Sequence, residues 1–237
     1  MIRAELFKAR HTRSVWGLTA IAAAFCVGWA ALEVFVFHQI DDAYAMAQQG
    51  YIFALLVGIQ LTAGEYRHQT ITWTLLVQPN RGRVITTKLV ACGVIGAAMG
   101  VAAAVVTAPA TALMLAVSGN PVVTPGVPAA LLGSVLSTAL WAVFGAAIGL
   151  LVRNQVAATI AAFVWFFYAE WFLVAMVPAV GRWTPTGVSK SIVGWSRDGL
   201  PVAGDLLPLW AGTAVFLGYA VVAAVVARLV SVRREVT

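Results

Sequence analysis

The chain has 237 residues, of which 61% are hydrophobic and only 10% are charged. In a soluble domain about a quarter of the residues are charged. This composition therefore excludes an ordinary soluble protein and indicates that lipid surrounds most of the surface. The net charge of +6 does not indicate nucleic-acid binding, because the basic residues lie at the ends of apolar runs, where lipid headgroups and insertion orientation account for them.

The first apolar run, residues 15–37, follows a basic stretch. It is longer than the apolar part of a secretory signal peptide, and it lacks a clear cleavage pattern of small residues. We therefore predict that it is retained as the first membrane span. Residues 1–14 are predicted to form an amphipathic helix that leads into it.

Six apolar runs are long enough to cross a bilayer, since about 20 helical residues cover a hydrocarbon core of about 30 Å. The second is the weakest prediction, because its continuous apolar part is short and it must borrow preceding residues. The chain is predicted to be one all-α, polytopic transmembrane domain with about six transmembrane helices. The predicted spans are residues 15–37, 46–64, 89–117, 129–152, 156–178 and 206–230.

The basic residues indicate the orientation of these spans. If both termini are cytoplasmic, 12 of the 15 Lys and Arg residues lie on the cytoplasmic side and 3 on the other, as the positive-inside rule requires. Five or seven spans would spoil this alternation. The cytoplasmic set is Arg3, Lys8, Arg10, Arg13, Arg67, Arg81, Arg83, Lys88, Arg153, Arg228, Arg233 and Arg234, and the opposite set is Arg182, Lys190 and Arg197.

Small residues recur at four-residue spacing in two of the spans. Gly96 and Gly100 form one such pair, and Gly145 and Gly149 form another. This spacing allows helices to approach closely in lipid. Chance in alanine- and glycine-rich spans is an equally good explanation.

The sequence offers no catalytic motif. It contains no phosphate-binding loop of the form GxxxxGK[ST], no HExxH and no paired CxxC. His11, His38 and His68 fall on different loops or opposite membrane sides, and Cys26 and Cys92 lie inside apolar runs. We predict no catalytic residue, no metal site and no cofactor bound by this chain, and therefore no enzyme.

Two connections between spans are long. Residues 179–205 are predicted on the extracytoplasmic side, where Trp183 and Trp195 suit the headgroup layer. In the cytoplasmic connection, residues 65–88, apolar side chains recur at helical spacing over residues 71–76, and residues 80–83 are predicted to form a basic turn. Such a helix can bind in a groove of a soluble partner. The alternative is a surface loop whose arginines only hold the orientation.

This cytoplasmic connection resembles the segment between the second and third spans of ATP-binding cassette (ABC) permeases of the type-2 export family. That segment typically reads Glu-[Tyr/Phe]-Arg-x-Gly-Thr, then Thr-Leu-Leu, then a Pro, an Arg and a Lys; Gln69 departs from the usual glycine. The residues that match are Glu65, Tyr66, Arg67, Thr70, Thr74, Leu75, Leu76, Pro79, Arg81 and Lys88. Residues 3–16 resemble the amphipathic N-terminal helix of the same family.

The resemblance implies a permease subunit of an exporter in the cell membrane, paired with a second copy or a paralogue. It also implies separate ABC ATPase subunits that bind ATP and Mg²⁺ and receive the cytoplasmic helix. The substrate would be hydrophobic or amphiphilic, such as a drug or lipid, and the composition hints at a bacterial source. A non-transporting membrane protein, such as an assembly factor or sensor scaffold, stays open. The implied coupling residues are Glu65, Tyr66, Arg67, His68, Thr70, Leu75, Leu76 and Arg81.

Two acidic residues, Glu33 and Glu170, fall in the outer halves of predicted spans. A carboxylate in lipid usually faces the bundle interior or water. With Trp165 and Tyr168, Glu170 could form a pathway site for a cationic amphiphile. The alternative is an aromatic belt at the membrane surface, with Glu170 hydrogen-bonded to a neighbouring span.

Overall fold

The computed structural model describes residues 2–38, 40–67, 76, 80–152, 154–170, 172, 176–195 and 206–233, without the side chains of residues 81, 167, 178 and 231–233. Throughout these ranges the ordered elements are helices, with no strand. The prediction of an all-α chain is therefore confirmed.

Within the described ranges, four helices are long and apolar enough to cross a membrane. Only 17% of the most apolar part of the last one is buried within the chain, so its side chains must face lipid or another apolar surface. These elements indicate a membrane protein. They are α2 (Arg13–Leu32) continued by the π-helix η1 (Glu33–Phe37), α5 (Arg81–Val117), α6 (Val127–Val152) and α11 (Leu209–Arg233).

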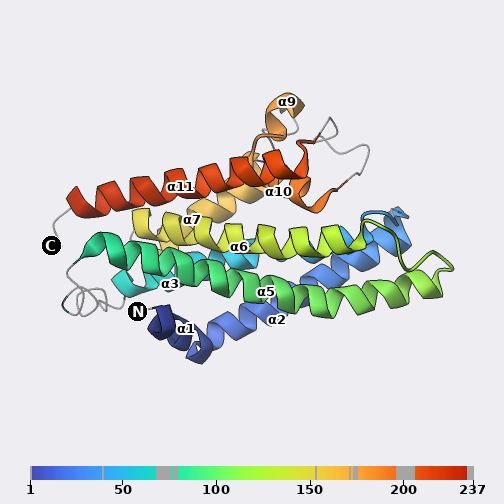
Figure 1. Cartoon of the computed structure of the whole chain (residues 1–237), viewed down its shortest axis with the longest axis horizontal. Coiled ribbons are helices and arrows are strands. Elements are labelled where there is room, and N and C mark those ends of the chain that lie inside the picture. Colours follow the sequence, from blue (N-terminus) through green and yellow to red (C-terminus); the bar gives the residue numbers. More distant parts are fainter. Residues whose placement is uncertain are drawn as a thin grey trace.

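The second predicted span falls on two helices, and the fifth is described without gaps only as far as residue 170. Residues 46–64 fall on a 3₁₀-helix, η2 (Ala43–Gln48), and on α3 (Tyr51–Arg67), which has 17 residues. Residues 156–178 begin with α7 (Gln155–Val164) and a π-helix, η3 (Trp165–Ala169). Both α3 and α7 run alongside the four long helices (Figure 1).

The predicted basic turn at residues 80–83 is wrong. Asn80 caps α5, because its side chain accepts a hydrogen bond of 3.1 Å from the backbone N–H of Arg83, and the helix begins at Arg81. Asparagine is a strong N-cap residue, since it satisfies a backbone donor that no helical carbonyl can reach. The third predicted span therefore starts eight residues too late. The predicted helix over residues 71–76 lies outside the described residues, apart from Leu76.

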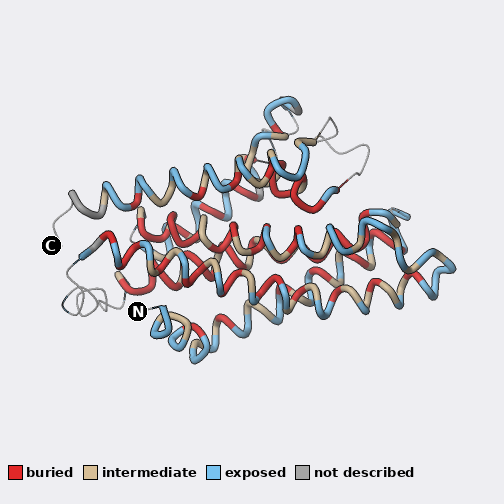
Figure 2. The backbone as a smooth tube through the Cα atoms, in the orientation of Figure 1, coloured by how far each residue is buried: buried red, intermediate tan, exposed pale blue. Residues whose placement is uncertain are grey.

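Glycines bring the central helices into close contact, as their spacing predicts. A Cβ atom on Gly145 would lie 2.1 Å from the carbonyl oxygen of Leu55 in α3, and one on Gly149 would lie 2.2 Å from a side-chain oxygen of the same helix. Gly96 and Gly100 of α5 would approach α6 to 2.5 Å and 2.8 Å. Helices α3 and α6 accordingly hold much of the buried chain (Figure 2).

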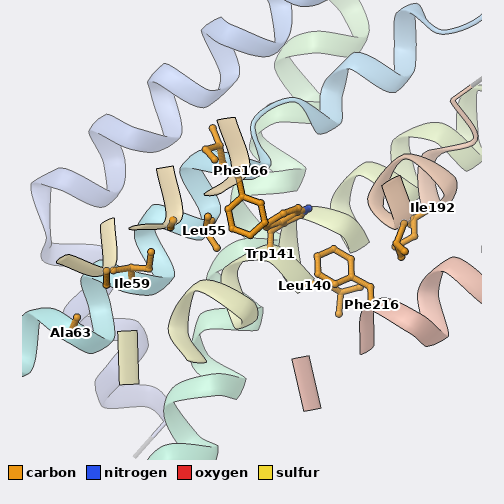
Figure 3. Close-up of a cluster of buried hydrophobic side chains, with 12 residues drawn as sticks. Leu55, Ile59, Ala63, Leu140, Trp141, Phe166, Ile192 and Phe216 are labelled. Atoms are coloured by element: carbon orange, nitrogen blue, oxygen red, sulfur yellow. The ribbon is translucent and has the colours of Figure 1, made fainter. Parts of the chain in front are cut away.

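An aromatic cluster fills the centre of the bundle. The fully buried ring of Trp141 on α6 packs edge-on against Phe166, at 4.8 Å between ring centroids, and against Phe216 of α11, at 5.2 Å (Figure 3). Edge-to-face pairs of this kind are the favoured arrangement of aromatic rings. The cluster therefore ties α6 to η3 and α11.

The predicted extracytoplasmic connection contains two short helices, α9 (Pro178–Gly181) and α10 (Pro185–Val193). Val188 and Ile192 of α10 are fully buried, so this helix packs into the bundle rather than lying flat on it. The helices α9 and α10 lie at one end of the bundle, and α1 (Ile2–His11) and the last turn of α11 lie at the other (Figure 1). We call these the α10 end and the α1 end.

Candidate functional site

Four charged side chains join three helices at the α1 end. Glu5 and Lys8 come from one face of α1, since they are three residues apart, Glu65 comes from α3 and Lys88 from α5. The Lys88 Nζ atom lies 2.6 Å from Glu65 Oε1 and 3.0 Å from Glu5 Oε1. Lys8 donates a hydrogen bond to the same Glu65 oxygen. We call these four residues the charge cluster.

The centre of the charge cluster is buried. The side chains of Lys88 and Glu65 are 2% and 5% exposed, whereas Glu5 and Lys8 lie at the rim at 19% and 43%. A buried ion costs several kcal/mol in lost hydration unless it is paired. Because α1 supplies one acid and one base, its docking completes the pairing of the two buried charges.

The pKa of Glu65 reflects this balance. Burial raises the pKa of the carboxyl, but the charge of Lys88 and the hydrogen bonds from Lys88 and Lys8 outweigh it and hold the pKa below its ordinary value of 4.5. Glu65 is therefore a carboxylate at neutral pH.

Helix α1 is held by apolar contacts as well. Ala9 is 3% exposed and belongs, with Leu61 of α3 and Ile95 of α5, to one buried cluster against which Leu6 packs. On the opposite face, Phe7 is 65% exposed. The face of α1 that meets the bundle therefore carries both charged and apolar contacts.

The predicted coupling residues that the structure describes point in different directions. Glu65 faces the interior, and Tyr66 packs at the edge of a cluster that contains Ile85 and Leu150. Arg67 is exposed at the end of α3. Arg67 is therefore exposed to a protein outside the chain, whereas Glu65 is not.

The remaining predicted coupling residues lie at or beyond the limits of the described chain. Leu76 is 70% exposed. Arg81 is the first residue of α5, and its side chain is outside the described part. His68, Thr70 and Leu75 lie outside the described residues.

Sequence reasoning placed Glu5, Lys8 and Lys88 in motifs but missed that both lysines contact Glu65 and that Glu5 pairs with Lys88. The available signal was the pair of opposite charges at helical spacing in α1, together with a lysine that lies within the first turns of an apolar helix. A lysine in such a position needs a carboxylate partner, but spacing alone does not say which one.

Both intramembrane acids lie at π-helices. Glu33 is the first residue of η1 and is fully buried. Glu170 follows η3, is 2% exposed, and its Oε1 atom accepts a hydrogen bond of 2.8 Å from the backbone N–H of Thr186 in the first turn of α10. π-Helices often occur at functional positions. Here η3 directs the side chain of Glu170 at the N-terminus of α10.

The predicted aromatic walls do not enclose Glu170. Trp165 is 54% exposed and Tyr168 is 67% exposed, so both rings face the surroundings of the bundle. The observed partner of Glu170 is the backbone of the short helix α10, whereas the alternative interpretation placed its partner on a neighbouring span.

Four buried side chains, joined by hydrogen bonds that the sequence did not predict, fix α10 to the bundle. Ser189 of α10 lies 2.7 Å from the hydroxyl of Ser137 and accepts a hydrogen bond of 2.9 Å from the indole N–H of Trp141. The side-chain amide of Gln48 donates a hydrogen bond to each of the two serine hydroxyls, and the bond to Ser137 is 3.2 Å long. We call these four residues the polar hub. It joins η2, α6 and α10.

Among the described residues, no group of three or more His, Cys, Asp or Glu is placed to hold a metal ion. Comparison with known proteins gives no match, either to a protein-family model or to a curated protein sequence. The likeness to type-2 ABC permeases therefore rests on the two sequence motifs alone.

Proposed function

We propose that this chain is the membrane-spanning permease subunit of an ATP-driven exporter of the ABC type-2 kind. The observation that carries the proposal is the contact between Lys8 and Glu65. These residues belong to the two separate motifs that resemble the family, they are 57 positions apart, and they share a hydrogen bond.

The arrangement of the helices supports six membrane crossings. α3, preceded by η2, and α7, extended by η3, run beside the four long helices, and α1 and the last turn of α11 lie at the same end (Figure 1). An even number of crossings brings both termini to one side. The excess of basic residues on the elements of the α1 end makes that side cytoplasmic in a cell membrane.

In this proposal a separate ABC ATPase binds ATP and Mg²⁺ and docks at the α1 end. Arg67 is exposed there to contact the ATPase, and the charge cluster links the end of α3 to α1 and α5. Closure of the ATPase would favour one of two packings of these helices. A second permease copy or a paralogue would complete the exporter, and a hydrophobic or amphiphilic substrate would move outward.

The test is co-purification with the ABC ATPase encoded beside this chain. Arg67→Glu should abolish the complex and ATP-driven export, because it reverses the charge of the exposed contact. Arg197→Glu is the matched control, since its side chain is predicted on the opposite side of the membrane, and it should leave both unchanged. If Arg67→Glu retained the complex and export, the proposed coupling site would be wrong.

The alternative, a membrane scaffold without transport, predicts a different result. The purified chain would then form no complex with an ABC ATPase, and deleting its gene would leave export of hydrophobic compounds unchanged. A susceptibility screen of the deletion strain separates the two.

A further inference from the structure

The face of α1 that is turned away from the bundle carries two arginines and an aromatic ring. Arg3, Phe7 and Arg10 follow one another at spacings of four and three residues, so they lie on one side of the helix. All three are exposed, whereas the contacts of α1 with the bundle come from its other side. The start of α2 adds two more exposed residues, Arg13 and Trp16. We call these five residues the arginine face.

The turn between α1 and α2 fixes the direction in which the arginine face points. The indole N–H of Trp16 donates a hydrogen bond of 2.7 Å to the carbonyl of Arg10, and the Thr12 hydroxyl donates one of 2.8 Å to the carbonyl of Lys8. Both carbonyls belong to the last turn of α1, where no following turn of the helix can bond to them. Because the charge cluster also binds α1 to the bundle, the backbone that carries the arginines has a fixed place beside the first long helix.

The charge cluster also fixes the level of α1 along the bundle. Lys88 is the last charged residue of the chain before Arg153, and Glu65 is the first one after Asp42. Each therefore stands where a long apolar stretch meets the polar surroundings of the membrane. Glu5 of α1 bonds to Lys88, so α1 lies at the level of the lipid headgroups.

The arginine face is complementary to an anionic surface. Its three arginines form no salt bridge within the described part of the chain. Glu5, the only acidic residue among residues 1–32, is turned toward Lys88 and away from this face. Guanidinium groups bind phosphate through paired hydrogen bonds, and exposed Phe and Trp rings suit the boundary between headgroups and acyl chains.

We propose that the arginine face binds the headgroups of anionic phospholipids in the surrounding bilayer. The lipid phosphates would bind Arg3, Arg10 and Arg13, and the rings of Phe7 and Trp16 would contact the upper part of the acyl chains. Helix α1 would then be held by the charge cluster on one side and by lipid on the other. This binding needs neither ATP nor a partner subunit, so it does not depend on the exporter proposal.

The experiment identifies what lies against Phe7 in a bilayer. Phe7 of the full chain is replaced by the photoreactive amino acid benzoylphenylalanine, and the purified chain is reconstituted in vesicles of equal amounts of dioleoyl phosphatidylglycerol and dioleoyl phosphatidylcholine. These lipids differ only in the headgroup, which is anionic in the first. After irradiation, mass spectrometry measures the adducts of each lipid. About five phosphatidylglycerol adducts are expected for each phosphatidylcholine adduct, the preference that one arginine gives to an anionic lipid.

Variants of the probe-bearing chain test the arginines. Arg3→Gln combined with Arg10→Gln should return the adducts to the lipid ratio of the bilayer, and each single substitution should give an intermediate ratio. Arg228→Gln is the matched control, because Arg228 is also exposed at the α1 end but lies on α11, on the other side of the bundle (Figure 1). It should keep the preference. A probe in place of Val105, which is 67% exposed in the apolar part of α5, should report the bilayer ratio.

Melting temperatures equal to that of the unmodified chain show that these variants fold. Adducts of the Phe7 probe in the bilayer ratio, or the same preference with and without Arg3 and Arg10, would overturn the selectivity for anionic headgroups. The probe is also irradiated in the membranes of the expressing cells. Adducts to protein instead of lipid there would show that another subunit covers the arginine face, and would overturn the proposal.

Discussion

The ammonium group of Lys88 lies 2.6 Å from Glu65 Oε1, and both side chains are almost completely buried. This pair connects the start of α5 to the end of α3, and α1 covers it with a further acid and base. The docking of a surface helix is thereby coupled to the neutralisation of two buried charges, which makes the α1 end sensitive to the loss of any one partner.

Replacing Lys88 by methionine should destabilise the protein by about 3–5 kcal/mol, because it leaves the Glu65 carboxylate buried without its nearest counter-ion. Denaturant unfolding of the purified protein in detergent measures the effect. Lys8→Met is the control and should cost about 1 kcal/mol or less, since Lys8 is 43% exposed and solvent screens its charge. Equal losses in the two variants would contradict the prediction.

The contribution of Glu65 to stability should depend on pH. Its pKa in the folded chain lies below the ordinary value of 4.5, so its stabilisation is fully present above that pH and is lost as the pH falls through the folded pKa. Melting curves of the unmodified protein and Glu65→Gln, from about pH 7 down to about pH 3, should show a gap that closes at low pH. A constant gap would show that ionisation of Glu65 does not stabilise the fold.

Gly145→Ala should greatly reduce the yield of folded protein. The added methyl group would lie 2.1 Å from a backbone oxygen of α3, so the two central helices would have to separate. Gly218→Ala in α11 is the matched control, because a Cβ there meets nothing within 4 Å, and it should be neutral or stabilising by up to about 1 kcal/mol. Size-exclusion profiles of the two variants compare them directly.

Ser189→Ala should destabilise the protein by about 1–3 kcal/mol, because it leaves the indole N–H of Trp141 buried without an acceptor. Ser191→Ala is also a buried substitution, but within the described residues the Ser191 hydroxyl donates to the Gly187 carbonyl of its own helix, so a much smaller loss is expected. Thermal unfolding distinguishes them, and similar melting temperatures would argue against the polar hub as the anchor of α10.

Substitutions of Glu170 should separate anchoring from transport. Glu170→Gln keeps an oxygen that can accept the hydrogen bond from Thr186 and should retain the stability of the unmodified chain. Glu170→Leu removes the acceptor and should cost about 1–3 kcal/mol. If Glu170→Gln kept full stability but lost export, the carboxylate would belong to the substrate pathway instead.

The sequence was sufficient to predict the helical class and the approximate positions of the four long apolar helices in the described ranges, because apolar length is a local property. Spacing also predicted the glycine contacts of Gly96 and Gly145. The start of α5 was missed although Asn80 is a recognisable cap, because basic residues and a glycine follow it and favoured a turn. A cap and a turn share the same residue types.

The contacts between distant residues could not be read in the same way. Several bases of the predicted cytoplasmic side could have paired with Glu65, and only the packing of α1 and α5 against α3 selects Lys8 and Lys88. The burial of α10 was equally hidden, because a nine-residue helix is too short for a clear apolar pattern and Ser189 looks like a surface residue until Gln48 is placed beside it. The π-helices add a residue to a turn, so the apolar pattern beyond them changes phase.

Helix α5 runs without interruption for 37 residues, a rod of about 55 Å. Lys88 lies near its first turns, and Leu115, near its last, is buried with Tyr44 of η2. Pro109 lies between them and cannot donate a backbone hydrogen bond to the preceding turn. The two parts of α5 can therefore bend relative to each other at Pro109, so a shift that breaks the contact between Lys88 and Glu65 can be absorbed there before it reaches Tyr44.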